Sequence, residues 1–530
     1  MTANALLKAA TPSTQTTSDN PTEMFRKRQS KELVIAFSGP LGCGIKTPVD
    51  TAQSLLTKMG YDVVRIKISE FIQTSIELKL ISLDGTAYSP GEGGRIRRMQ
   101  DGGNRLREQY KTLDILAEFA VRKIAADRTA RVPSEESLEG HVPKQTAYLI
   151  DQLKNPAEVA LFRTVYRNLF YLIGVLSVRP KREKRLLDRE IDPVEAANLI
   201  KIDQKEPDDF GQQLDKTLEL ADFFVRNDHP NAETVETSLS RFFGLIHGHN
   251  GLSPTQAEYG MYVAFAAGLR SACLSRQVGA AILDKQGNVL STGRNDVPKF
   301  GGGLYGPEDN HLDARCVKQE GKLCHAEKHK KSLRAKVEGL LQEKLKSEAK
   351  DISTEDISGI MDVIYRETRM KDLIEFSRAI HAEMDAIVSL ARSSAASSLG
   401  TTMYVTTYPC HNCARHIVAA GIERVYYIEP YEKSLAARLH GDSISIDPDA
   451  SDLNENQKLL FLHFEGVAPR QYLNLFRQHG ERKENGVAIP VPEDNFEKVV
   501  PEYLDSYQAF EAKVVNHLTD LIGPAGQSQV

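Results

Sequence analysis

Two short segments in the second half of the chain constrain its fold more than any other feature. The first is H-A-E, which contains His381 and Glu383, and the second is P-C-H-N-C, which contains Cys410 and Cys413 and begins 26 residues after Glu383. One imidazole and two cysteine sulfurs form a three-ligand zinc set that leaves the fourth tetrahedral position for water. A fold that uses this set must bring the two segments together.

The local geometry predicts a different role for the acid. Cys410 and Cys413 lie three residues apart at the start of a predicted helix, so their sulfurs point to one side, and the positive helix end favours thiolates. Glu383 follows His381 by two residues, about 200° around an ideal helix. We therefore expect Glu383 to reach over the helix end as a proton shuttle and not as a ligand.

The order H-x-E…P-C-x-x-C is the signature of zinc-dependent nucleobase deaminases. In that chemistry zinc lowers the pKa of water, Glu383 takes the proton, and attack on the ring carbon that carries the amine releases ammonia. Two alternatives remain open. A closed structural zinc site would use His411 or His416 as its fourth ligand, and a redox C-x-x-C pair would not need His381 or Glu383.

The composition places these motifs in an ordinary globular chain. Hydrophobic residues make up 41% and charged residues 26%, and the formal charge of −5 gives no global attraction for nucleic acid. The longest apolar run, 169–178, is about half the roughly 20 residues that cross a bilayer. The amino terminus lacks a secretory signal, and the six cysteines are too few for a disulfide scaffold. We expect a cytoplasmic protein with no membrane partner.

Alternating strand and helix patterns predict an α/β fold with a parallel sheet and flanking helices in the first half. The turn formers HNGLSP at 249–254 mark a domain boundary, and the glycine-rich segment 91–103 is predicted to be a loop. The predicted division is a flexible tail at 1–30, a P-loop-like domain at 31–250, a cytidine-deaminase-like α/β/α domain at 251–485 with an insertion at about 304–375, and an extension at 486–530.

A glycine-rich loop follows the first predicted strand. The segment 39–47, GPLGCGIKT, approaches the phosphate-binding pattern G-x-x-x-x-G-K-[ST], but Ile45 stands where lysine belongs. Lys46 comes one place late, which turns its side chain by about 100° on a helix. We predict sensing of ATP or another nucleotide with Mg²⁺ and not kinase activity, and a degenerate structural loop is the alternative. The candidate residues are Gly39, Gly42, Gly44, Lys46, Thr47 and Asp151, which ends the strand AYLID.

A second group of metal-ligating residue types lies in the predicted insertion. It consists of Asp313, Cys316, Cys324 and His325. These residues are candidates for a second, structural metal site, but their irregular spacing is more typical of a solvated loop.

The region from about 254 to 431 resembles the cytidine and deoxycytidylate deaminase superfamily, in which helices flank a mixed sheet and carry the two motifs. Residues 269–282, LRSACLSRQVGAAI, and 291–295, STGRN, are similar to the strand and the substrate loop of the deoxycytidylate branch. The resemblance implies that Asn295 contacts the sugar, and a turn role is the alternative. The other substrate candidates are Arg276 and Lys299 for phosphates, and Tyr408 and Tyr431 for stacking on the base.

The two-part layout is similar to that of bacterial antiphage dCTP/dCMP deaminases, which are thought to deplete the deoxycytidine nucleotide pool during infection. It implies zinc-dependent deamination of free dCTP or dCMP and, by analogy, a homo-oligomer. A polynucleotide deaminase would need a basic, aromatic-lined groove, and a nucleotide kinase would need a correctly placed lysine. In a third hypothesis the first domain binds a regulatory RNA or a phage-derived trigger.

Overall fold

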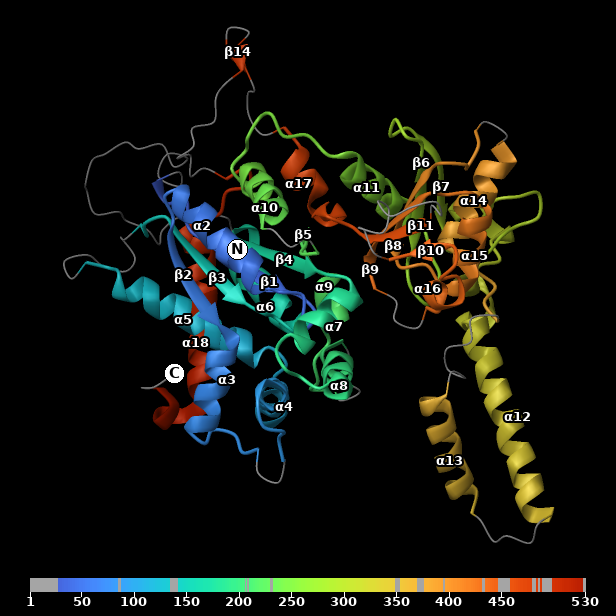
Figure 1. The fold of residues 1–530 in the computed structure, drawn as a ribbon, viewed down its shortest axis with the longest axis horizontal. Helices are drawn as coiled ribbons and strands as arrows, with labels where there is room; N and C mark the ends of the chain where they lie inside the picture. Colours follow the sequence, from blue (N-terminus) through green and yellow to red (C-terminus); the bar gives the residue numbers. More distant parts are fainter. Residues whose placement is uncertain are drawn as a thin grey trace, which may run out of the picture.

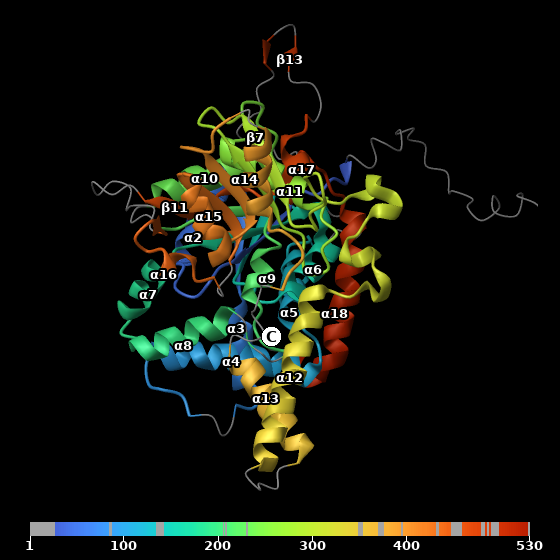
Figure 2. The same cartoon turned by 90° about the vertical axis from the view of Figure 1, so that its right-hand side faces the viewer.

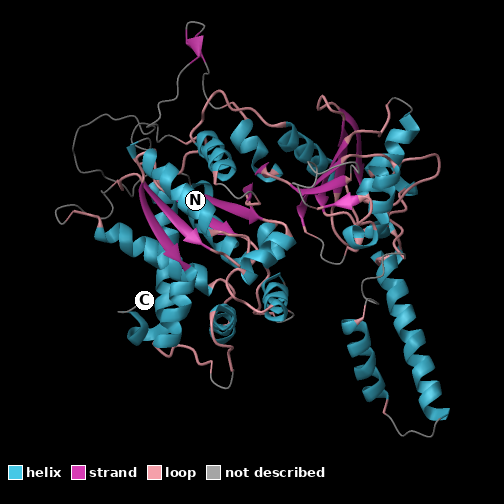
Figure 3. Cartoon of the chain, viewed as in Figure 1, coloured by secondary structure: helices cyan, strands magenta, loops and turns pink. Residues whose placement is uncertain are grey.

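A computed structural model describes residues 27–83, 87–133, 142–204, 206, 209–228, 232–347, 353–368, 376–393, 396–430, 434–446, 458–478, 483–484, 487–488 and 498–527. Two six-stranded sheets lie beside each other, each covered by helices (Figures 1 and 3). Strands β13 (Lys483–Glu484) and β14 (Val487–Ala488) form a separate hairpin. Within the described residues, no helix combines the length and the apolar character that crossing a bilayer requires.

The first sheet has its longest, fully buried strands at its centre. It contains β1 (Leu33–Ser38), β2 (Asp62–Lys67), β3 (Thr146–Asp151), β4 (Phe170–Leu176), β5 (Phe223–Arg226) and β12 (Gly466–Val467). The order is β12-β5-β4-β1-β3-β2, and β1 to β5 run parallel. All residues of β1 and β4 are buried because helices cover both faces of a parallel sheet.

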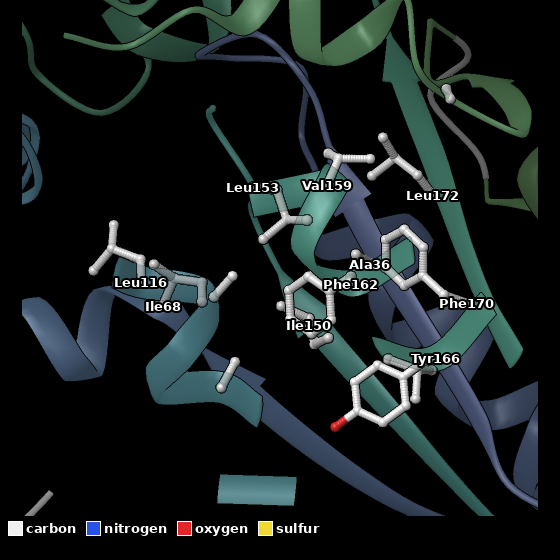
Figure 4. Packing of buried hydrophobic residues seen from close by; sticks show 14 of the residues in the cluster. Ala36, Ile68, Leu116, Ile150, Leu153, Val159, Phe162, Tyr166, Phe170 and Leu172 are labelled. Carbon is white, nitrogen blue, oxygen red and sulfur yellow. The ribbon is translucent and has the colours of Figure 1, made fainter. Parts of the chain in front are cut away.

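The two faces of this sheet form two separate cores. Its helices are α2 (Lys46–Lys58), α3 (Ile68–Glu77), α4 (Glu92–Tyr110), α5 (Ile115–Ala130), α6 (Pro156–Tyr166), α7 (Arg179–Leu187), α8 (Pro193–Gln204), α9 (Leu214–Leu218), α10 (Glu233–Ile246), α17 (Tyr472–Phe476) and α18 (Leu504–Gln527). Helices α2 and α10 pack on one face, while α3, α5, α6 and α18 pack on the other. In the second core the rings of Phe162 and Phe170 stack with centroids 5.2 Å apart, near Ile150 (Figure 4).

The second sheet is mixed. It contains β6 (Gly279–Leu283), β7 (Val289–Arg294), β8 (Thr402–Thr407), β9 (Arg424–Glu429), β10 (Ile444–Ser445) and β11 (Leu459–His463), in the order β10-β11-β9-β8-β6-β7. Strand β6 is antiparallel to both neighbours, and the other pairs are parallel. Helix α11 (Gln256–Gly268) packs on one face, and α14 (Ala382–Ser393) and α15 (His411–Ala419) pack on the other. Helix α16 (Ala436–Leu439) lies next to α15.

The mixed α/β class predicted from the sequence is confirmed, whereas the P-loop identity of the first part stays a prediction. Residues 91–103 were expected to form a loop, and this expectation is wrong because α4 runs through them. The glycines of α4 are buried: a Cβ at Gly102 would lie 2.6 Å from Ile72 of α3. Close helix packing therefore overrides the low helix propensity of glycine.

After the second sheet the chain returns to the first. Gly466 and Val467 of β12 pair with Phe224 and Phe223 of β5, and the Val467 amide donates to Glu258 of α11 at 2.9 Å. Helix α18 then packs along α5. The predicted division at 250 and 485 stays a prediction, and the range 251–485 includes residues of the first sheet.

Two helices project from the second sheet as a hairpin. They are α12 (His325–Ser347) and α13 (Thr354–Glu367), and both views show them extending away from the sheets (Figures 1 and 2). Ile357 and Met361 of α13 are buried. The hairpin lies within the range predicted to be an insertion.

Candidate active site

The two predicted ligand segments meet at the start of two neighbouring helices. His381 directly precedes α14, Cys410 is the N-cap of α15, and Cys413 lies in the first turn of α15. Glycine at position 293 in β7 lets α14 approach the sheet, because a Cβ there would lie 2.1 Å from the carbonyl oxygen of Ala382. Close packing of α14 on β7 thus fixes the position of His381.

The three ligand side chains converge. His381 Nδ1 lies 3.3 Å from the Cys410 sulfur and 3.4 Å from the Cys413 sulfur, and all three ligand atoms lie within 4.8 Å of one another. Across the described part of the chain, no other three His, Cys, Asp or Glu residues form such a group. One imidazole and two thiols are a donor set that fits zinc.

Hydrogen bonds within this group shift the pKa values of its three side chains. The hydrogen bond to Cys410 raises the pKa of His381 to about 9, and the hydrogen bond to Cys413 lowers the pKa of Cys410 to about 4. The same bond and burial raise the pKa of Cys413 far above its usual range. The cluster therefore favours one thiolate beside an imidazolium, and a metal ion would replace the protons.

Glu383 lies beside the ligands and outside the ligand cluster, as the helix geometry predicts. It is buried in the first turn of α14, and burial raises the pKa of its carboxyl to about 7. Glu383 lines a cavity of about 230 Å³ together with His381 and Cys410. A carboxyl that shares a cavity with the ligands can exchange protons with a molecule bound there.

Three of the predicted substrate residues line this cavity: Asn295, Arg276 and Tyr408. Asn295 is buried, its side-chain oxygen accepts from the Val278 amide at 2.7 Å, and its nitrogen donates to the Arg276 carbonyl at 2.8 Å. Arg276 forms an ion pair with Glu429 at 3.5 Å. Asn295 therefore both faces the site and holds the loop that carries Arg276.

The structure does not bring Lys299 to this cavity. Lys299 pairs with Asp309 at 2.6 Å and lines a separate polar cavity of about 320 Å³. Tyr431 lies outside the described residues.

Sequence reasoning missed the contribution of the insertion to the cavity wall. Ala326, Glu327 and Lys330 of α12 line the cavity, as do Ser275 and Ser377. The many charged residues of α12 are typical of a solvent-exposed helix. No sequence pattern indicates that the first turns of this helix face a cavity.

The predicted second metal group does not form a ligand set. Asp313 is held by Arg315 at 2.7 Å, and this hydrogen-bonded ion pair lowers the pKa of Asp313. Cys316, Cys324 and His325 line a cavity of only about 20 Å³. Three ligand atoms do not come together there as they do at His381, within the part of the chain that the structure describes.

The glycine-rich loop after β1 borders the largest of the cavities described here, about 760 Å³. Gly42 and Gly44 have positive φ angles of 82° and 76°, which glycine adopts without strain. Arg185 and Asn227 donate to the carbonyls of Cys43 and its glycine neighbours. Of the predicted loop residues, Gly42, Gly44, Lys46 and Asp151 line the cavity, whereas Gly39 and Thr47 do not.

Comparison with known proteins agrees with the metal cluster. The family described as cytidine and deoxycytidylate deaminase zinc-binding region matches residues 254–429. Deoxycytidylate deaminase of Enterobacteria phage T2 is 32% identical over 33% of this chain and 80% of its own length. The phage T4 enzyme of the same name is 33% identical over 33% of this chain and 78% of its own length.

Among solved structures, the dCMP deaminase of cyanophage S-TIM5 in complex with dCMP and dUMP aligns with 36% of this chain and 91% of its own chain, at 19% identity and a TM-score of 0.21. The family assignment rests on the sequence matches, which cover both ligand segments and the intervening helix α14. The chain belongs to the cytidine and deoxycytidylate deaminase family.

Proposed function

We propose that this chain hydrolyses the exocyclic amine of free deoxycytidine nucleotides, releasing ammonia. The observation that carries the proposal is the convergence of His381, Cys410 and Cys413 within 4.8 Å. The buried Glu383 lines the same cavity as two of these ligands. These three residues would hold zinc, which supplies the acidity that makes water reactive near neutral pH.

Glu383 moves the protons of the reaction. It accepts a proton from the attacking water and gives it to the ring nitrogen next to the carbon that is attacked. It then moves the proton of the new hydroxyl group to the amine, so that the carbon–nitrogen bond breaks and ammonia leaves. Burial supports this role because it excludes competing water from the carboxyl.

The cavity favours a single nucleotide over a polymer. Its volume of about 230 Å³ is small for a binding site. Among the described lining residues, Tyr408 is the only Phe, Tyr or Trp, and Arg276 and Lys330 are the only Arg or Lys. A polynucleotide enzyme would present a longer basic groove with several aromatic platforms. We place the base at Glu383 and the sugar at Asn295.

The relatives named as deoxycytidylate deaminases support dCMP as a substrate. We extend the proposal to dCTP, and to depletion of the dCTP pool in defence against phage, on the resemblance of the whole chain to antiphage deaminases. A homo-oligomer stays a prediction by analogy with other small-substrate deaminases. Binding of a regulatory RNA or a phage-derived trigger by the first domain stays a separate hypothesis.

Product analysis tests this function. The purified protein, supplied with zinc, is incubated with dCMP, dCTP, CTP or single-stranded DNA, and ammonia and uracil-containing products are measured. We expect turnover of dCMP or dCTP and none of the DNA. Activity on the polymer alone would refute the free-nucleotide proposal.

We propose a second function, nucleotide sensing, for the cavity of the first sheet. The observation in its favour is that Gly42, Gly44 and Lys46 line the same large cavity as Asp151 and Lys154, at the carboxyl ends of β1 and β3. Nucleotides bind at this edge of parallel α/β sheets. Isothermal titration with ATP and dCTP, with and without Mg²⁺, tests this proposal, and a fluorescent nucleotide provides a second binding assay. The proposal would be rejected if no binding heat were measured and neither nucleotide displaced the fluorescent one.

A further inference from the structure

The active-site cavity receives a cation from the projecting hairpin. Ala326, Glu327 and Lys330 of α12 all line it, at spacings that place them on one face of the helix. The Lys330 side chain is only 13% exposed, although α12 as a whole extends away from the sheets (Figure 1). The first turns of α12 are therefore part of the cavity wall, whereas the other described residues of the hairpin do not line it.

The second cation comes from the body of the deaminase sheet. Arg276 lies in the loop before β6, where its ion pair with Glu429 at 3.5 Å holds it at the cavity. Thr407, which also lines the cavity, donates to the same Glu429 carboxylate at 2.7 Å. Arg276 is thus positioned by the end of β8 and by β9, independently of the hairpin.

One ion-pair partner of Lys330 is half exposed. Lys330 pairs with Glu327 at 3.3 Å, one turn earlier in the same helix, and the Glu327 side chain is 52% exposed. Solvent at the half-exposed Glu327 carboxylate screens this ion pair. A phosphate carries up to two negative charges and accepts several charge-assisted hydrogen bonds, so it competes well for a lysine beside an arginine.

We propose that Lys330 and Arg276 together bind the phosphate of the substrate, so that the inserted hairpin makes the site selective for nucleotides over nucleosides. The hydroxyls of Ser275 and Ser377, which line the same cavity, are further donors for phosphate oxygens. This inference rests on the proposed deamination and adds the residue that reads the phosphate. Lys330 thus takes the phosphate-binding role that the sequence analysis had assigned to Lys299.

Binding and turnover of dCMP and deoxycytidine test the proposal. Dissociation constants are measured by equilibrium dialysis in zinc-loaded Glu383→Ala protein, with and without Lys330→Ala. Loss of one charge-assisted contact is expected to weaken dCMP binding roughly 10- to 100-fold and to leave deoxycytidine binding unchanged. In the active enzyme, Lys330→Ala should raise KM for dCMP with little change in kcat, and Lys330→Arg should restore much of the loss.

Lys331→Ala is the matched control, because Lys331 is the exposed neighbour of Lys330 on α12. It should leave both ligands unaffected, and Glu327→Gln should tighten dCMP binding by removing the competing carboxylate. Equal weakening of dCMP and deoxycytidine, or unchanged dCMP binding, would overturn the inference. Failure of the proposed function would give a different result. In that case zinc-loaded protein with intact Glu383 would release no ammonia from dCMP or from deoxycytidine.

Discussion

The two cavities to which we assign functions both lie at the carboxyl ends of strands, and they differ in how their polar groups are arranged. The cavity beside β1 and β3 measures about 760 Å³ and is lined by eight basic and four acidic residues. The cavity after β8 measures about 230 Å³, yet it is lined by a buried carboxyl and by two members of a group of three metal-ligating side chains whose ligand atoms lie within 4.8 Å of one another. Convergence of a few buried groups, and not volume or charge, identifies the chemistry.

The largest expected effect is on deaminase turnover, which we assign to the smaller of the two cavities. Glu383→Ala removes the only proposed proton carrier and should lower kcat by about 10²- to 10⁴-fold, because general acid–base catalysis contributes that much. Zinc content and thermal stability should stay close to those of the unmodified protein, since Glu383 lies outside the ligand cluster. Retained turnover, or loss of zinc, would contradict the assignment. Steady-state kinetics with metal analysis provide both readings.

Acid should weaken the core that α2 and α10 form on one face of the first sheet. His247 is buried between the Tyr61 hydroxyl at 2.8 Å and the Phe243 carbonyl at 2.7 Å, and burial lowers its pKa from 6.5 to about 4. Electrostatic interactions with the neighbouring Lys498 and His249 lower the pKa further. Because the folded state resists protonation, stability is present above pH 6.5 and is lost as the pH falls toward 4, by up to about 1.4 kcal/mol per pH unit.

Urea denaturation between pH 7 and pH 5 measures this dependence. His247→Gln should flatten the loss of stability with falling pH. His249→Gln, at the exposed neighbouring histidine, removes only a minor cause of the lowered pKa and should flatten it much less. The same pH dependence in both variants would show that the acid sensitivity lies elsewhere.

A backbone test examines the loop of the first cavity. Gly44→Ala would place a Cβ 2.6 Å from the Asn227 amide nitrogen, at a φ of 76°. We expect a loss of about 1–3 kcal/mol in the free energy of unfolding. Gly301→Ala is the control, because Gly301 has a φ of 85° with no atom within 4 Å of the added Cβ. Similar losses would mean that strain alone is responsible.

Deaminase turnover should be unchanged in Gly44→Ala below its unfolding temperature if the two cavities work independently. A parallel fall in turnover would instead reveal coupling between the loop and the active site.

The smallest effect is expected for Lys46→Ala. Lys46 is exposed at the start of α2, so its contact with a nucleotide phosphate should contribute only about two- to fivefold in affinity. Titration with ATP and Mg²⁺ measures the change, and Lys58→Ala, at the far end of the same helix, serves as the control. Unchanged affinity would reject a phosphate role for Lys46.

The sequence predicted the ligand cluster because spacing at helix starts is a local property. The ligand cluster forms where the starts of two helices lie side by side, and these helix starts carry His381, Cys410 and Cys413. Residues of these types in this order are typical of a catalytic zinc site. Lys330 could not be predicted in the same way. Its helix has the charge pattern of a solvated surface, and only the folded hairpin shows that its first turns face the cavity.

The predicted elements show the same limit. The apolar run of β1 was recognisable because a strand buried on both faces is continuously hydrophobic. Helix α4 was missed because buried glycines at a helix contact look like turn residues, and the two-residue β12 carries no pattern of its own. Lys299 was predicted to lie near the active site because it is close in sequence to Asn295. The structure places it at a different cavity.

The antiparallel pairing of β12 with β5 also has a consequence for biosynthesis. As the polypeptide leaves the ribosome, the first sheet cannot acquire its outer strand until residue 467 has been made. The intervening deaminase segment must therefore emerge, and can fold, while the edge of the sheet at β5 is still open. Expression of residues 31–250 alone would leave that edge without its natural neighbour, and a nick in the connection at 249–254 would leave two fragments still held together by this pairing.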